Sequence, residues 1–146
     1  MNRKIFLSIV FSFSIFCAFS QNETNTAGVV YLTKSDFLQK IANYQTNPEK
    51  FIYLGDKPCI IDFYADWCMP CRHVAPILEE LSKEYTGKIY IYKINVDKEK
   101  ELSALFGISN IPAILFIPQT GTPQMAVGQY PKSVYVEAIN NFLLKN

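Results

Sequence analysis

The chain has 146 residues, with 14 lysines and arginines against 13 aspartates and glutamates, so its formal net charge is only +1. This length suits a single domain that buries one hydrophobic core. Basic residues do not cluster among aromatic residues in the sequence, which argues against a nucleic-acid partner.

The first 20 residues have the pattern of a cleaved signal peptide. Arg3 and Lys4 precede residues 5–18, which are apolar apart from serines, and small residues follow at the two positions that a signal peptidase reads. The apolar run is shorter than the roughly 20 residues that a membrane-spanning helix needs. We therefore expect cleavage before Gln21; the alternative is an uncleaved N-terminal anchor.

After cleavage, residues 21–28 are expected to form a flexible polar leader and residues 29–146 one domain. Cys17 would leave with residues 1–20, so three of the four cysteines remain. An odd number of cysteines in an oxidising compartment leaves at least one thiol outside any intrachain disulfide. Because two of the three form a C-x-x-C pair, the pattern indicates a redox pair rather than a disulfide framework.

The sequence then alternates between strand and helix patterns. Apolar runs of strand length predict strands over residues 29–33, 59–65, 88–96, 113–117 and 124–127. Amphipathic patterns predict four helices: the first is capped by Ser35, the second contains Pro76, the third ends at Gly107 and the last covers residues 133–144. The order βαβαβα followed by ββα predicts an α/β fold with helices on both faces of a central mixed sheet. We expect the sheet to be parallel where helices cross over, and to end in an antiparallel hairpin.

The segment Trp67-Cys68-Met69-Pro70-Cys71 lies where a buried strand ends and the long helix begins. Cysteines three residues apart in a first helical turn have Cα atoms about 5–6 Å apart, which a disulfide tolerates. The free N–H groups and dipole of the helix N-terminus favour a thiolate and lower the pKa of Cys68. Cys71, one turn further in, is expected to be more buried and less acidic. We therefore expect Cys68 to attack a disulfide and Cys71 to resolve the product.

Other interpretations of the cysteine pair have less support. A zinc site needs two more ligands, and the candidates are Cys59, in a buried strand, and the solitary imidazole of His73. Covalent haem attachment needs a histidine directly after the second cysteine, where this chain has Arg72. A purely structural disulfide would close too small a loop to restrict the unfolded chain much. We expect no metal site and, because no flavin or nicotinamide site is visible, no cofactor.

Asp62 interrupts the apolar run of the buried strand. A carboxylate in such a place is costly unless it is paired or protonated, so its pKa should be raised. Near Cys71, it would be able to accept the proton of that thiol. The alternative, equally open from the residues alone, is that Asp62 lies at a strand edge or pairs with Lys93.

The chain resembles the thioredoxin family, and exported bacterial members in particular. The resemblance covers residues 29–144 and rests on the segment from Ile61 to Cys71 and on Gly107-Ile108-Ser109-Asn110-Ile111-Pro112. No long insert separates Cys71 from Pro112, unlike exported relatives that carry one. The resemblance implies a thioredoxin fold and a periplasmic location.

The resemblance also implies roles for individual residues. Pro112 would have a cis peptide bond that faces the disulfide, Asp62 would be the buried proton acceptor, and Lys93 would be its partner. The substrate groove would be formed by Trp67, Met69, Pro70, Ile111, Pro112, Val127 and Gly128. Met69 stands where typical thioredoxins have glycine, and because it is neutral we expect a reduction potential nearer to reducing thioredoxins than to strong oxidases.

These observations predict a monomeric protein-disulfide reductase of the periplasm. Its partners would be oxidised client proteins and, as electron donor, a membrane-embedded thiol reductase. The alternatives are a disulfide-forming oxidase and a non-catalytic peptide-binding module with the same fold. Cys59 is expected to be a buried free cysteine that acts as a small hydrophobe.

Overall fold

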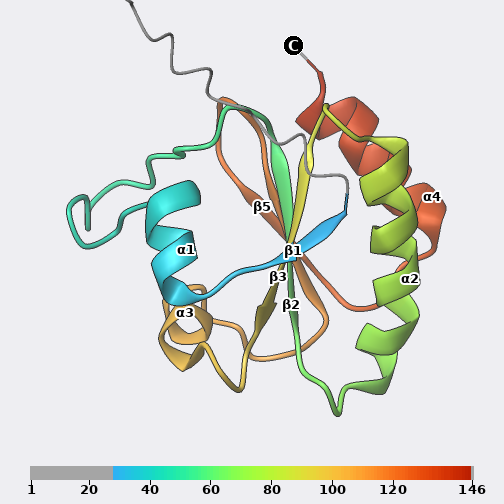
Figure 1. The fold of residues 1–146 in the computed structure, drawn as a ribbon, viewed down its shortest axis with the longest axis horizontal. Coiled ribbons are helices and arrows are strands. Elements are labelled where there is room, and N and C mark those ends of the chain that lie inside the picture. Colours follow the sequence, from blue (N-terminus) through green and yellow to red (C-terminus); the bar gives the residue numbers. More distant parts are fainter. Residues whose placement is uncertain (1–27, 146) are drawn as a thin grey trace, which may run out of the picture.

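A mixed sheet lies between two layers of helices in the structure, a computed structural model that describes residues 28–145 (Figure 1). The expected signal peptide and nearly all of the expected leader lie outside these residues. The elements follow one another as β1 (Val29–Tyr31), α1 (Lys34–Lys40), β2 (Cys59–Tyr64), α2 (Met69–Glu84), β3 (Tyr90–Asn95), α3 (Lys100–Leu105), β4 (Ala113–Ile117), β5 (Gln124–Val127), α4 (Lys132–Ala138) and the π-helix η1 (Ile139–Leu143). None of the described helices is both long and apolar enough to cross a bilayer.

The five described strands are arranged in the order β1-β3-β2-β4-β5, so β2 lies at the centre. β3 pairs in parallel with β1 and β2, whereas β4 is antiparallel to both β2 and β5. The expectation of parallel strands at every helical crossover is therefore wrong for the connection through α3. With six residues, α3 is only about 9 Å long, and it cannot return the chain along a strand of about 20 Å.

The first helix begins two residues before the position that the sequence favoured. Thr33, not Ser35, is the N-cap: its hydroxyl group accepts a hydrogen bond from the Asp36 N–H at 3.2 Å. The Asp36 carboxylate in turn accepts the Thr33 N–H at 3.1 Å. This reciprocal capping box satisfies two free N–H groups, an arrangement that Ser35 does not form with a residue three positions later.

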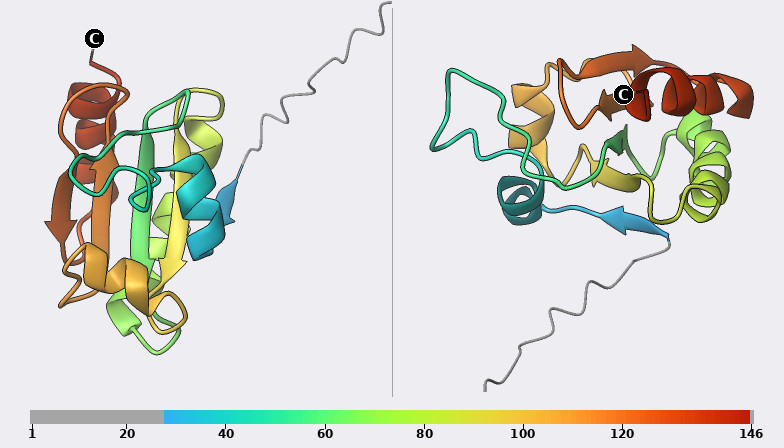
Figure 2. Two further views of the ribbon diagram at one scale, coloured as in Figure 1. Left: turned by 90° about the vertical axis from the view of Figure 1, so that its left-hand side faces the viewer. Right: turned by 90° about the horizontal axis from the view of Figure 1, so that it is seen from above.

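Each face of the sheet has its own hydrophobic core, and the right-hand view in Figure 2 shows helices on opposite sides of the sheet. Cys59, Ile61 and Phe63 of β2 belong to the core covered by α1 and α3, whereas Ile60 belongs to the core covered by α2 and α4. Because side chains alternate along a strand, Asp62 faces the α2 and α4 side.

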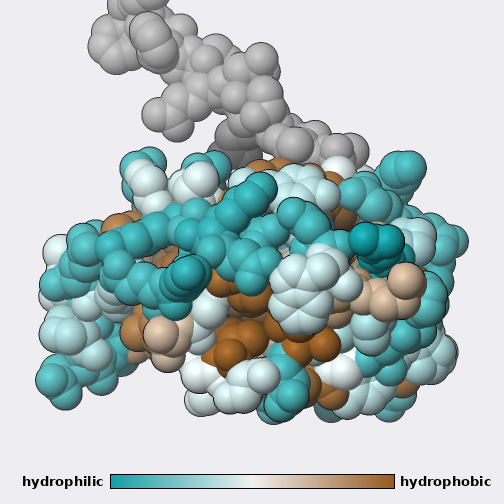
Figure 3. All heavy atoms as spheres, turned by 90° about the horizontal axis from the view of Figure 1, so that it is seen from below, coloured by the Kyte–Doolittle hydropathy of each residue, from teal (hydrophilic) through white to brown (hydrophobic). Residues whose placement is uncertain are grey.

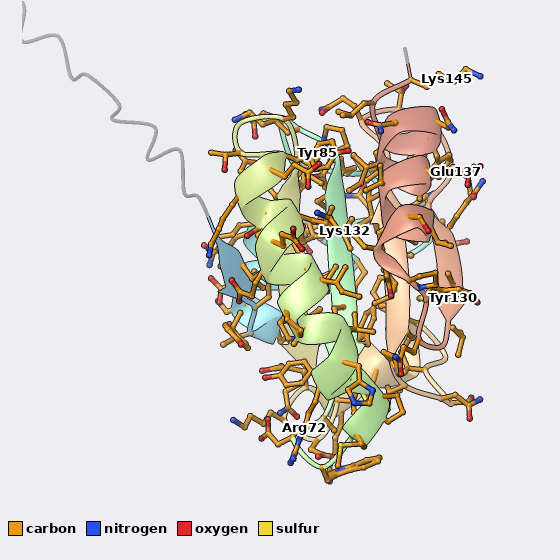
Figure 4. All side chains as sticks on the ribbon, turned by 90° about the vertical axis from the view of Figure 1, so that its right-hand side faces the viewer. Arg72, Tyr85, Tyr130, Lys132, Glu137 and Lys145 are labelled. Carbon is orange, nitrogen blue, oxygen red and sulfur yellow. A yellow bond between two sulfur atoms is a disulfide. The ribbon has the colours of Figure 1, made fainter. Side chains whose placement is uncertain are left out.

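The two helices on that side are linked by charge. Lys132 lies at the start of α4, and its Nζ is 2.8 Å from Glu80 Oε1 and 2.9 Å from Glu84 Oε2 of α2. Figure 4 shows Lys132 between the two helices. These groups are partly exposed, so we expect the pairs to fix how α4 lies against α2 more than to add stability.

Candidate active site

The cysteine pair lies at the junction of the central strand and the longest described helix. Cys68 is the N-cap of α2, and Cys71 lies in its first turn. Pro70 is tolerated there because the first N–H groups of a helix have no intrahelical partner. The two cysteines form a disulfide with Cα atoms 5.3 Å apart. β2 and α2 thus hold both sulfurs at one end of the sheet.

The helix N-terminus distinguishes the two sulfurs. The backbone N–H of Cys71 donates to Cys68 Sγ at 3.2 Å, so the Cys68 sulfur receives one of the free N–H donors in the first turn of a 16-residue helix. In the reduced protein the same donor and the helix dipole favour a Cys68 thiolate. The expected difference in burial is absent, because Cys68 is 3% and Cys71 2% exposed. Both sulfurs are covered in the disulfide by a small cluster that includes Ala65 and Ile111.

Asp62 is buried and paired at the same time. The β2–β3 register places it opposite Lys93, whose Nζ donates to Asp62 Oδ2 at 2.7 Å. Both side chains are almost fully buried, and Asp62 lies on the central strand rather than at an edge. Burial raises the pKa of Asp62 more than the Lys93 ammonium group lowers it. The expected raised pKa therefore occurs together with the Lys93 pairing, which the residues alone offered as an alternative to a proton-accepting role.

A hollow lies beside Lys93 and the resolving cysteine. It has a volume of about 210 Å³, and its lining includes Cys71, Lys93, Tyr31 and Tyr64. Lys93 Nζ lies 4.3 Å from the centre of the Tyr64 ring, and Tyr31 packs edge-on against Tyr64. Neither tyrosine stands out in the sequence, apart from the position of Tyr64 at the end of the buried strand. The hollow thus places Cys71 and Lys93, the partner of Asp62, on one lining.

The expected groove residues lie around the disulfide on the same end of the molecule. The Ile111–Pro112 peptide bond is cis, and the Pro112 carbonyl accepts the Gly128 N–H at 2.8 Å. Gly128 has φ 116°, a conformation that favours glycine. Met69 and Val127 are exposed, and Figure 3, which looks at this end, shows hydrophobic surface gathered in its middle. This surface would suit the main chain and apolar side chains of an extended peptide.

One contact of Trp67 was not foreseen. Its ring is 68% exposed, yet its indole N–H donates to Asp97 Oδ2 at 2.9 Å. Asp97 follows β3, so the bond ties the cysteine loop to the neighbouring strand end. It holds the ring beside the disulfide, where a substrate can contact it.

The ligands considered for zinc are separated by the sheet. Cys59 is buried in the core on the α1 and α3 side, whereas His73 lies on α2, with Nδ1 3.2 Å from Gln129 Oε1. Within residues 28–145, no three His, Cys, Asp or Glu side chains are placed to hold a metal ion.

A strand-to-helix cysteine pair opposite a cis-proline is the arrangement that the resemblance implied, and comparison with known proteins decides the family. The thioredoxin family model matches residues 28–141. The chain belongs to the thioredoxin family. It is 42% identical over 113 residues to a thioredoxin of Borreliella burgdorferi, an alignment that covers 77% of this chain and 96% of the relative. It is also 34% identical over 115 residues to a thioredoxin of Haemophilus influenzae, covering 79% and 97%.

The solved structure of chloroplastic thioredoxin z has a TM-score of 0.64 to this chain at 24% identity, covering 80% of this chain and 95% of that one. The predicted thioredoxin fold and family are thus confirmed. The chain is a thiol–disulfide oxidoreductase, and its family acts on oxidised protein substrates.

Proposed function

We propose that this thioredoxin reduces protein disulfides in the periplasm, with Cys68 as nucleophile, Cys71 as resolving cysteine and Asp62 as proton acceptor. The observation that carries the proposal is the position of Cys68 Sγ, which receives the N–H of Cys71 at the N-terminus of α2. A sulfur held there is the one whose negative charge the helix stabilises.

The first step joins the protein to its substrate. The Cys68 thiolate attacks one sulfur of a client disulfide, the client S–S bond breaks, and the departing client thiolate takes a proton from water. The product is a mixed disulfide between Cys68 and the client. The exposed ring of Trp67 and the side chains of Met69 and Val127 would contact the client next to the attacked sulfur.

The second step releases the client. The Cys71 thiol gives its proton to the Asp62 carboxylate, by way of water in the hollow that Cys71 and Lys93 line. The Cys71 thiolate then attacks Cys68 Sγ, the mixed disulfide breaks, and the client sulfur leaves as a thiolate, which takes a proton from water. Two electrons have passed from the protein to the client, and the protein is left with the Cys68–Cys71 disulfide that the structure contains.

The direction of electron flow follows from the residues between the cysteines. Met69 and Pro70 are neutral, so neither adds a charge that would stabilise the Cys68 thiolate as in strong oxidases. We expect a reduction potential nearer to about −270 mV than to about −120 mV. A protein of this potential in an oxidising compartment needs a supply of electrons, and a membrane-embedded thiol reductase would provide it. The exchange needs one copy of the chain, consistent with a monomer.

The test is equilibration of the active-site disulfide with glutathione, together with insulin reduction by dithiothreitol. A potential near that of reducing thioredoxins and catalysis of insulin reduction would support the proposal. A potential near about −120 mV would instead indicate a disulfide-forming oxidase. Failure to accelerate insulin reduction would indicate a non-catalytic peptide-binding module.

A further inference from the structure

Two buried polar side-chain atoms lack a hydrogen-bond partner in the part of the chain that the structure describes: Asp62 Oδ1 and the hydroxyl oxygen of Tyr135. Asp62 is 0% and Tyr135 1% exposed. An unpaired buried polar group is costly, so each one in a native protein calls for an explanation. Each of these two groups has what the other lacks, because the carboxylate accepts hydrogen bonds and the hydroxyl group donates one.

The two groups lie on the same side of the sheet. Asp62 alternates with Ile60 along β2 and stands opposite Ile114 of β4. Ile60, Ile114 and Tyr135 belong to one core, the one between the sheet and α2 with α4. Side chains of a helix lean toward its N-terminus. Tyr135 therefore leans toward Tyr130, which precedes α4, and this is the end of the molecule that carries the disulfide.

The electrostatics agree with this placement. Burial raises the pKa of Tyr135 to about 12, and the charge of Asp62 adds to this rise. Tyr135 is thus a neutral donor at physiological pH. The charged group that faces Asp62 is Lys93 of β3, and β4 presents the apolar Ile114. From α2, Cys71 shares the lining of a hollow with Lys93.

We propose that Tyr135 is a positioning residue that acts through Asp62. Its hydroxyl group donates to one buried water molecule, which in turn donates to Asp62 Oδ1, the oxygen that Lys93 does not bind. Water that bridges buried polar groups is a common part of protein interiors. This bond favours the ionised carboxylate and opposes the effect of burial. Tyr135 thereby extends to lower pH the range in which Asp62 accepts the Cys71 proton, a consequence that rests on the proposed role of Asp62.

The test is Tyr135→Phe, which keeps the ring and removes the hydroxyl group. In the oxidised protein labelled with ¹³C at aspartate carboxyl groups, we expect the midpoint of the Asp62 titration to rise by about 0.5–1 pH unit, the worth of one hydrogen bond. Tyr85→Phe is the matched control, because it removes another buried tyrosine hydroxyl group from the same core. The Tyr85 hydroxyl group donates a hydrogen bond to Asn140 Oδ1, and Tyr85 lies at the far end of α2 from Arg72 and the active site (Figure 4). Removing this hydroxyl group should leave the midpoint of the Asp62 titration unchanged.

The rate of mixed-disulfide release gives a second readout. In Tyr135→Phe, the acid limb of the pH profile of this rate should shift to higher pH by the same amount. In an Asp62→Asn background, removing the Tyr135 hydroxyl group should not change the profile. An unmoved Asp62 titration, or an equal shift in Tyr85→Phe, would overturn the link between Tyr135 and Asp62. A moved titration with an unmoved rate profile would keep that link and reject Asp62 as the proton acceptor.

Discussion

Replacing Asp62 with asparagine should stabilise the oxidised protein at neutral pH, although it removes a partner of Lys93. Burial raises the pKa of Asp62 above its ordinary value despite the ammonium group 2.7 Å away. The folded protein therefore binds the Asp62 proton more tightly than the unfolded chain does. Asparagine resembles the protonated acid, and its carbonyl oxygen can still accept the Lys93 hydrogen bond.

The sign and size follow from proton linkage. Because the folded-state pKa of Asp62 is raised, the free energy of unfolding of the wild type falls as pH rises from the unfolded-state pKa of about 3.9 to the folded-state pKa. At higher pH the contribution of Asp62 stays constant. The stability of Asp62→Asn does not show this fall, because asparagine does not titrate. The stability of the variant relative to wild type should therefore grow over this window by about 1.4 kcal/mol for each unit by which the folded-state pKa exceeds the unfolded one, and then stay constant.

Urea unfolding of both oxidised proteins across the acid-to-neutral range measures this difference. Asp36→Asn is a control of opposite sign, because hydrogen bonds from Thr33 and Lys40 lower the pKa of Asp36 to about 2. The Asp36 carboxylate stabilises the fold above about pH 3.9, and this contribution is lost as pH falls toward 2. The Asp36→Asn variant should therefore become less stable relative to wild type as pH rises through this range. If Asp62→Asn also lost stability as pH rose, the attraction of Lys93 would exceed the cost of burial, and the reasoning that makes Asp62 a proton acceptor would fail.

Three further predictions concern the reaction and export. Cys71→Ser should accumulate mixed disulfides with client proteins that disappear on reduction, while Cys68→Ser should trap little; equal trapping by both on non-reducing gels would contradict the assigned roles. Asp62→Asn should slow client release on the order of 10²–10⁴-fold, more than it slows attack, and the loss should shrink at high pH, as single-turnover kinetics can show; an equal loss in both steps at every pH would make Asp62 structural. The protein recovered from the periplasm should have an intact mass that begins at Gln21, and a mass that begins at Met1 would reject the cleaved signal peptide.

Local patterns in the sequence were enough to predict most of the fold. The apolar run of β2, the helical period of α2 and the C-x-x-C at their junction are each set by neighbouring residues, so they locate the disulfide without the structure. Strand direction was less accessible, because the antiparallel pairing of β4 depends on how far α3 carries the chain in space.

Contacts between distant segments set the limit of prediction at the site. Asp62 and Lys93 are 31 positions apart, so the residues alone offer their pairing as one alternative among others, and the β2–β3 register establishes it. The Trp67–Asp97 bond and the unpaired hydroxyl group of Tyr135 likewise depend on packing between elements. In the sequence, Tyr135 is one more apolar position on an amphipathic helix, and nothing in its neighbours indicates that its oxygen is left without a partner.

The third cysteine of residues 28–145 gives the protein an internal probe of its own unfolding. Cys59 is free and 0% exposed, and burial raises the pKa of its thiol to about 12. While the active-site disulfide is intact, a thiol-specific reagent can therefore label Cys59 only in molecules whose central strand has opened. The labelling rate of the oxidised protein then measures the free energy of that opening under native conditions, without denaturant and without any engineered residue.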